Sequence, residues 1–175
     1  MATGERGLHE LSIQEATNAT AQRKVVRVSP TLQAAATDAN DVMFNGTEIP
    51  NATLKPGGCS RLLRLEIVNY SDTTCDIDLV FTENAVTLGT VDAAVSITDA
   101  DLKTAKVLGV AEIDVSVTEV DLINMLTVSE GRERTVGING IMLQAAKDST
   151  SVYFAGIDRT GADVDDLEFI FHIEY

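Results

Sequence analysis

From residue 23 onward, most of the chain alternates hydrophobic and polar residues. Such alternation points every second side chain to the same face and is typical of a half-buried β-strand. The polar residues 71–74 separate two such runs and have the composition of a turn, so we expect those two strands to form a hairpin. The pattern predicts strands over residues 23–28, 63–70, 77–82, 107–117, 151–157 and 167–175.

Two short interruptions of the strand pattern favour helices. Thr98 and Thr118 each stand three residues before an acidic residue and precede leucines, an arrangement typical of a helix cap. We expect helices of one or two turns at both places. Between residues 135 and 143, Asn139-Gly140 suits either a tight hairpin or a bulge, and the short flanking runs favour one bulged strand.

Seven to nine strands with little helix predict an all-β fold, either an antiparallel β-sandwich or a jelly roll, with one or two short connecting helices. Residues 23–175 contain no linker and form one predicted sandwich domain. Residues 1–22 are small and polar with no useful hydrophobic period, so we expect an extended N-terminal arm. The arm is either a frayed terminus or a segment that becomes ordered on a neighbouring subunit.

Acidic residues outnumber basic ones by 27 to 13, which gives a net charge of −14. Residues 61–130 carry four basic and 13 acidic side chains, whereas residues 1–60 are nearly neutral. A field of this sign repels phosphate backbones and anionic lipid, so neither nucleic acid nor a membrane is an expected partner. The sequence also lacks a spanning apolar run and a signal peptide, which predicts synthesis in a cytoplasm.

Clustered carboxylates are the first candidates for chemistry, because calcium takes several oxygen ligands. The chain lacks the spaced acids and interior glycine of a calcium-binding loop, so solvated carboxylates are favoured, with a weak site between subunits left open. A carboxylate pair for sugar hydrolysis is disfavoured by the absence of tryptophan and an aromatic content of 5%. The clusters are Asp76 and Asp78, Asp99 and Asp101, and Asp163, Asp165 and Asp166.

General bases and nucleophiles are scarce. His9 lies in the arm, His172 is expected on the outer face of the last strand, and neither has a nucleophile motif around it. A reducing cytoplasm favours free thiols at Cys59 and Cys75 over a bridge between them. The glycines form no phosphate-binding loop. We therefore predict no catalytic, cofactor-binding or metal-binding residue, and no enzyme activity.

One set of motifs resembles a family of virion structural proteins of tailed bacteriophages. In that family, Thr-Glu-Ile-Pro-Asn-Ala leads into a glycine-bearing turn and then an Asp-Leu-x-Phe strand, as it does here at residues 47–52, 57–58 and 78–81. The similarity covers residues 24–157, and none of its motifs is catalytic. Its other motifs are Asp41–Gly46, Val86–Thr90, Ser96–Asp101 and Leu108–Val110.

The resemblance implies a β-rich particle component, with a capsid cement or decoration protein as the leading expectation. Such a protein would bind the outer surface of a shell of major capsid protein, and the resemblance favours a homotrimer. The alternatives are a neck, tail or fibre component, and a carbohydrate-binding module for attachment to a host surface. The carbohydrate alternative requires a cleft lined by calcium or by aromatic rings, and the available tyrosines are Tyr70, Tyr153 and Tyr175.

Overall fold

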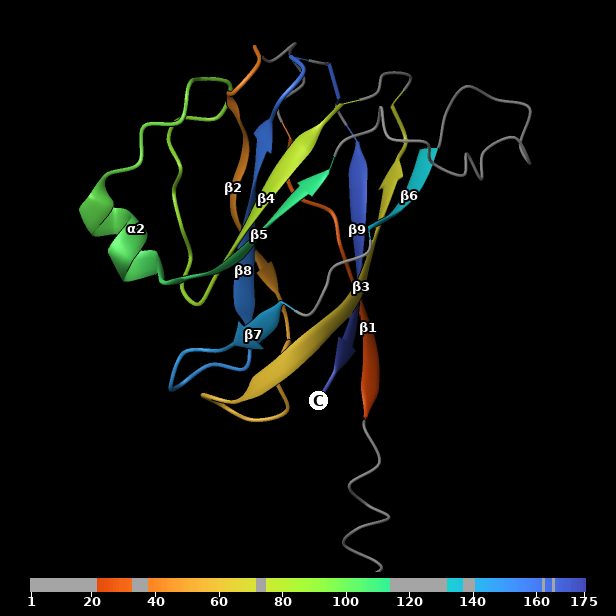
Figure 1. The fold of residues 1–175 in the computed structure, drawn as a ribbon, viewed down its shortest axis with the longest axis vertical. Coiled ribbons are helices and arrows are strands. Elements are labelled where there is room, and N and C mark those ends of the chain that lie inside the picture. The colour runs from red at the N-terminus through yellow and green to blue at the C-terminus, as the bar shows by residue number, and fades with distance from the viewer. Residues whose placement is uncertain are drawn as a thin grey trace, which may run out of the picture.

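A computed structural model describes residues 22–32, 38–71, 75–113, 132–136, 141–161, 163–164 and 166–175. These residues form nine strands and one helix (Figure 1). They are β1 (Arg23–Val28), β2 (Val42–Ile49), β3 (Cys59–Asn69), β4 (Ile77–Thr82), α2 (Asp99–Ala105), β5 (Val107–Ile113), β6 (Arg132–Val136), β7 (Met142–Gln144), β8 (Val152–Asp158) and β9 (Leu167–Glu174). Of the predicted arm, only Gln22 is described; its carbonyl accepts a hydrogen bond of 2.9 Å from the Tyr175 amide.

The strands form two antiparallel sheets that face each other across one core. The first sheet has the order β1-β9-β3-β6, with β7 also paired to β3, and the second has the order β2-β8-β4-β5. The pairs are nested along the chain, because β1 pairs with β9, β2 with β8, β3 with β6 and β7, and β4 with β5. This nesting is the topology of a jelly roll, and it confirms the predicted all-β antiparallel sandwich.

Strands β6 and β7 share one edge of β3. Leu65 is paired with Val136 of β6, and Arg61 is paired with Met142 of β7, both in antiparallel register. The two short strands therefore run in the same direction, so they do not form a hairpin with each other. The tight-hairpin alternative for residues 135–143 is thus wrong, whereas the bulge predicted at Asn139-Gly140 falls in residues 137–140, which lie outside the described part.

The predicted hairpin between residues 63–70 and 77–82 is wrong. Strand β3 belongs to the first sheet and β4 to the second, so the chain crosses between sheets after Asn69. Leu65 of β3 and Leu79 of β4 are both fully buried in the same core, into which they point from opposite sheets. Facing strands of a sandwich and paired strands of a hairpin each bury one face, so both have the same alternation in sequence.

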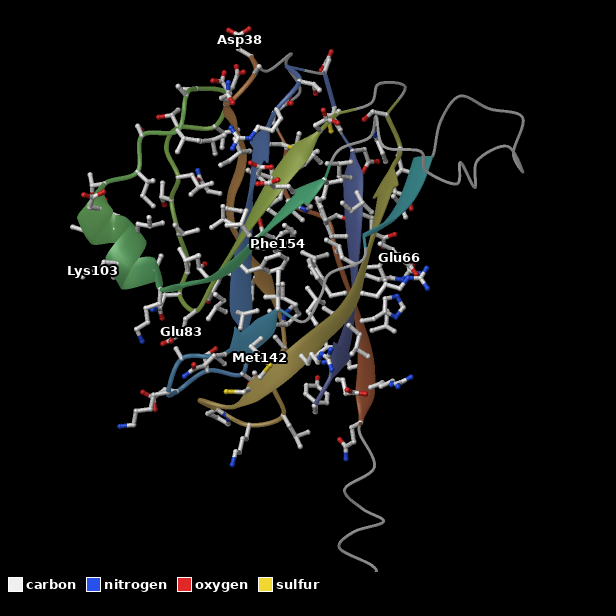
Figure 2. The ribbon with its side chains drawn as sticks, in the orientation of Figure 1. Asp38, Glu66, Glu83, Lys103, Met142 and Phe154 are labelled. Carbon is white, nitrogen blue, oxygen red and sulfur yellow. The ribbon has the colours of Figure 1, made fainter. Side chains whose placement is uncertain are left out.

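All five phenylalanines of the chain meet in the core between the sheets. Phe154 of β8 is the central ring, and Figure 2 shows it between the two sheets. Its centroid lies 5.0 Å from that of Phe171, 5.1 Å from Phe169, 5.2 Å from Phe44 and 6.4 Å from Phe81. Since these five rings come from both sheets and are at most 1% exposed, they join the two layers.

A second, smaller core lies on the outer face of the second sheet. The connection from β4 to β5, residues 83–106, covers this face and contains α2 (Figure 1). Val80 and Ala155 of the sheet belong to one buried cluster with Val86, Leu88 and Ala105 of the connection. The second sheet is therefore buried on both faces over part of its area.

Helix α2 confirms the helix predicted at residues 98–101. The Thr98 hydroxyl accepts a hydrogen bond of 3.2 Å from the Asp101 amide, which caps the first turn. Lys106 ends the helix in the left-handed conformation, with φ of 56°, and its amide bonds to the Leu102 carbonyl. The second predicted helix, at residues 118–121, lies outside the described part.

Candidate functional site

Charge is divided unevenly between the two sheets. Strands β1, β3 and β9 of the first sheet carry five basic and three acidic residues, whereas the strands of the second sheet carry four acidic residues and no Lys or Arg. In a protein of net charge −14, the first sheet is thus the cationic side. The basic residues of these three strands are Arg23, Lys24, Arg27, Arg61 and Arg64.

Ion pairs cover the outer face of the first sheet across β1, β9 and β3. In each pair the arginine is the more exposed partner, so guanidinium groups form the layer that meets solvent. The pairs are Arg23–Glu174 at 3.4 Å, Arg27–Glu168 at 2.9 Å and Arg64–Glu66. In that order, the arginine side chains are 74%, 60% and 47% exposed, and the glutamate side chains are 24%, 19% and 14% exposed. Figure 2 shows Glu66 on the side of the sheet away from Phe154.

The same side of the protein exposes apolar groups beside the arginines. Val25, between Arg23 and Arg27 on β1, is 53% exposed, and Tyr70, directly after β3, is 47% exposed. The Tyr70 hydroxyl donates a hydrogen bond of 3.3 Å to Glu168. Desolvation and the neighbouring Glu168 carboxylate raise the pKa of Tyr70, which stays a hydrogen-bond donor at neutral pH.

A hollow of about 220 Å³ opens at one end of this face. Basic residues from two strands line it, Arg23 and Lys24 from β1 and Arg64 from β3. Val25 and Leu63 supply apolar wall, and His172 and Ile173 of β9 complete the lining. A hollow of this size accommodates a side chain or a small anion rather than a cofactor, since ligand pockets typically measure about 300–1,000 Å³.

His172 lies on the outer face of the first sheet, as predicted. Its Nε2 atom is shielded from solvent and lies 3.3 Å from Glu66 Oε1, without the alignment of a hydrogen bond. The residues that line the hollow include no hydroxyl or thiol that the imidazole could activate. This histidine therefore has a carboxylate neighbour but no nucleophile within the hollow that it lines.

The acidic clusters named from the sequence do not form a metal site in the described part of the chain. There, no group of three or more His, Cys, Asp or Glu side chains is placed so that it could hold a metal ion. Asp78 is bound by the guanidinium of Arg159, whose Nε lies 2.7 Å from Oδ2. Asp99 and Asp101 occupy the first turn of α2, where Asp101 accepts a bond of 2.6 Å from the Thr98 hydroxyl. Asp165 and His9 lie outside the described part.

A fully buried carboxylate, Asp158 at the end of β8, was not singled out from the sequence. Its Oδ1 atom accepts bonds of 2.8 Å and 3.0 Å from the Thr160 and Gly161 amides, and one of 3.1 Å from the Thr160 hydroxyl. These bonds hold the turn that follows β8 and satisfy the buried charge. We assign Asp158 a structural role.

The two cysteines are free, and they differ in environment. Cys59 is exposed at the start of β3, and Cys75 is buried before β4. Burial raises the pKa of Cys75 to about 12, and the carboxylates of Asp158 and Asp76 add to the rise. Because the thiolate is the reactive form, we expect Cys75 to be unreactive in the folded protein.

We predict that a maleimide at about pH 8 modifies Cys59 and leaves Cys75 unmodified until the protein unfolds. Mass spectrometry of the labelled chain should find one adduct without urea and two in concentrated urea. A Cys59→Ser variant serves as the control and should acquire no adduct while folded. Two adducts on the folded wild-type protein would show that Cys75 is accessible.

The second hollow, of about 520 Å³, lies between α2 and residues 85–97. Its lining includes the hydroxyl-bearing residues Thr87, Thr90, Ser96 and Thr104 but no aromatic ring. Sugars bind largely by stacking on aromatic faces, so this hollow does not suit them. Neither hollow is lined by Tyr70, Tyr153 or Tyr175.

Sequence reasoning missed the arginine-bearing face. Arg23 and Arg27 stand at alternate positions of the first predicted strand, which was the available signal. Their glutamate partners lie on β9, almost the whole length of the chain away, so only strand pairing brings them together. The bulge between Leu62 and Arg64 also brings Arg61 and Arg64 to the same outer face although they are three residues apart, which strict alternation does not predict.

Comparison with known proteins found no matching family model and no matching curated protein. Among the described residues, no helix has the length and apolar character that crossing a membrane requires.

Proposed function

We propose that this protein is a non-enzymatic structural component of a bacteriophage virion, specifically a decoration protein on the outer surface of a shell of major capsid protein. One observation carries the proposal. Most motifs that resemble phage virion proteins lie in β2, β4, β5 and the connection that contains α2, where residues of separate motifs bind each other.

The contact between these motifs centres on Asn45 and Gly46 of β2. The Asn45 side chain donates a bond of 2.9 Å to the Gly89 carbonyl and accepts one of 2.7 Å from the Leu88 amide. The Gly46 amide donates a bond of 2.7 Å to the Val86 carbonyl, and a Cβ at Gly46 would lie 2.6 Å from the Val86 nitrogen. The motif residues thus secure the cover to the second sheet, which supports an architectural role for them.

The fold is compatible with the proposal, because jelly rolls occur in viral capsid proteins as well as in lectins. The acidic side formed by the second sheet keeps such a subunit soluble before assembly. The proposal includes a homotrimer, which the resemblance to phage virion proteins favours. It includes no contact with nucleic acid or membrane.

The copy number of the chain in purified virions tests this proposal. A protein that decorates the shell repeats with the lattice, so quantitative mass spectrometry against the major capsid protein should find hundreds of copies in each particle. The major capsid protein, counted in the same sample, is the internal control. A few copies would indicate a neck, tail or fibre component, and absence from particles would overturn the virion role.

A further inference from the structure

We propose that the outer face of the first sheet is the docking face of this protein, and that its partner is a protein surface that presents carboxylates. This inference deepens the proposed function, on which it rests for the identity of the assembly. We call the outer side of β1, β9 and β3, with Arg23, Arg27, Arg61 and Arg64, the arginine face.

The first argument is that the arginine side chains of the ion pairs stay exposed to solvent. A guanidinium has five N–H donors, and the bonds to Glu174 and Glu168 engage Nε of Arg23 and one terminal nitrogen of Arg27. Both arginines stay more than half exposed although their glutamates are largely covered. The pairs therefore hold the arginines in place while leaving donors directed at solvent, where a second carboxylate binds with bidentate geometry.

The composition of the face is the second argument. Arginine and tyrosine are enriched in protein interfaces, and lysine is depleted. The arginine face bears four arginines with exposed Val25 beside them, and Tyr70 stands at its margin. The cations of the α2 connection are lysines instead, Lys103 and Lys106.

The alternation of charge on the face argues for a protein partner rather than a nucleic acid. Glu66, Glu168 and Glu174 lie between the arginines and retain some exposure. A duplex would bring a continuous row of phosphates against these carboxylates. A folded protein can place individual carboxylates over individual arginines, with one in the hollow between Arg23 and Arg64.

The opposite side of the molecule completes the argument. Figure 1 shows α2 and its connection on the far side of the second sheet from β1 and β9. That side carries Asp92, Asp99 and Asp101 and is acidic, like the second sheet itself. A subunit that docks through the arginine face leaves its acidic side toward solvent, which suits a protein on the outside of a particle.

Titration of the full chain with octaglutamate, followed by backbone amide NMR, tests the docking face. We expect shifts confined to β1, β9 and β3, and an Arg23→Gln/Arg27→Gln variant should bind about tenfold more weakly. Lys103→Gln/Lys147→Gln is the matched control, because it removes the same charge elsewhere and should bind as the wild type does. Circular dichroism of both variants confirms that they are folded.

Three results would overturn the docking face: no binding of octaglutamate, shifts on another surface, or equal weakening in both double variants. Tighter binding of a DNA duplex than of octaglutamate would also overturn it, in favour of a nucleic-acid partner. The copy number in virions is measured separately and does not depend on this titration. Failure of the docking face and failure of the virion role are therefore distinguishable.

Discussion

Replacing Phe154 with alanine should lower the free energy of unfolding by about 3–5 kcal/mol, as expected for loss of a large aromatic side chain from a core. Phe154 is fully buried and lies at the centre of a cluster with four other rings. Those rings belong to strands of both sheets, which cannot close the cavity without changing strand pairing. Because the chain lacks tryptophan, unfolding in urea is followed by far-UV circular dichroism.

Tyr70→Ala is the control for this measurement, since it removes an aromatic ring that is 47% exposed. We expect its cost to stay below about 1 kcal/mol, as for most surface substitutions. Equal losses in the two variants would contradict the central position of Phe154 in the core. A Phe154→Leu variant, which keeps most of the buried volume, should fall between them.

Gly156→Ala is expected to cost about 1–3 kcal/mol through overpacking. A Cβ at Gly156 would lie 2.3 Å from Cε1 and 2.7 Å from Cζ of Phe44. Phe44 cannot retreat easily, because its ring is held by Phe154 at 5.2 Å and Phe169 at 5.6 Å between centroids. Urea denaturation of the variant, again followed by circular dichroism, measures the loss.

Two further variants identify the cause of that loss. In Gly109→Ala the new Cβ would lie 3.3 Å from side-chain atoms of Ile141, which is partly exposed and able to shift, so we expect a smaller effect. In Gly156→Ala/Phe44→Leu the smaller side chain relieves the clash, so the two costs should combine to less than their sum. Strict additivity would show that contact with Phe44 is not the reason Gly156 is required.

Strand β9 illustrates what local pattern predicts well. Leu167, Phe169, Phe171 and Ile173 stand at alternate positions, and the structure buries all four while leaving His172 on the outer face. The same reasoning failed for β3 and β4, because alternation records which residues are buried but not against which sheet. For α2, the cap at Thr98 was enough to predict the helix, because capping depends on residues within one helical turn.

The candidate site was much harder to predict from the sequence than the fold was. Counting charge along the chain placed the acidity after residue 60, yet in space the division runs between the two sheets. Arg27 and Glu168 are 141 residues apart and become neighbours because β1 pairs with β9. No local sequence pattern indicates that these two residues pair.

By itself, the sequence determined the all-β class, most strand positions, α2 and the strong negative charge, since these depend on periodicity, capping and composition. Tertiary structure alone decided the nested strand order, the five-ring core, the cover over the second sheet and the arginine face. Each of these requires long loops to close, which costs conformational entropy. That cost is offset only when buried surfaces from distant strands fit together. That fit depends on the register of paired strands, which local residue patterns do not encode.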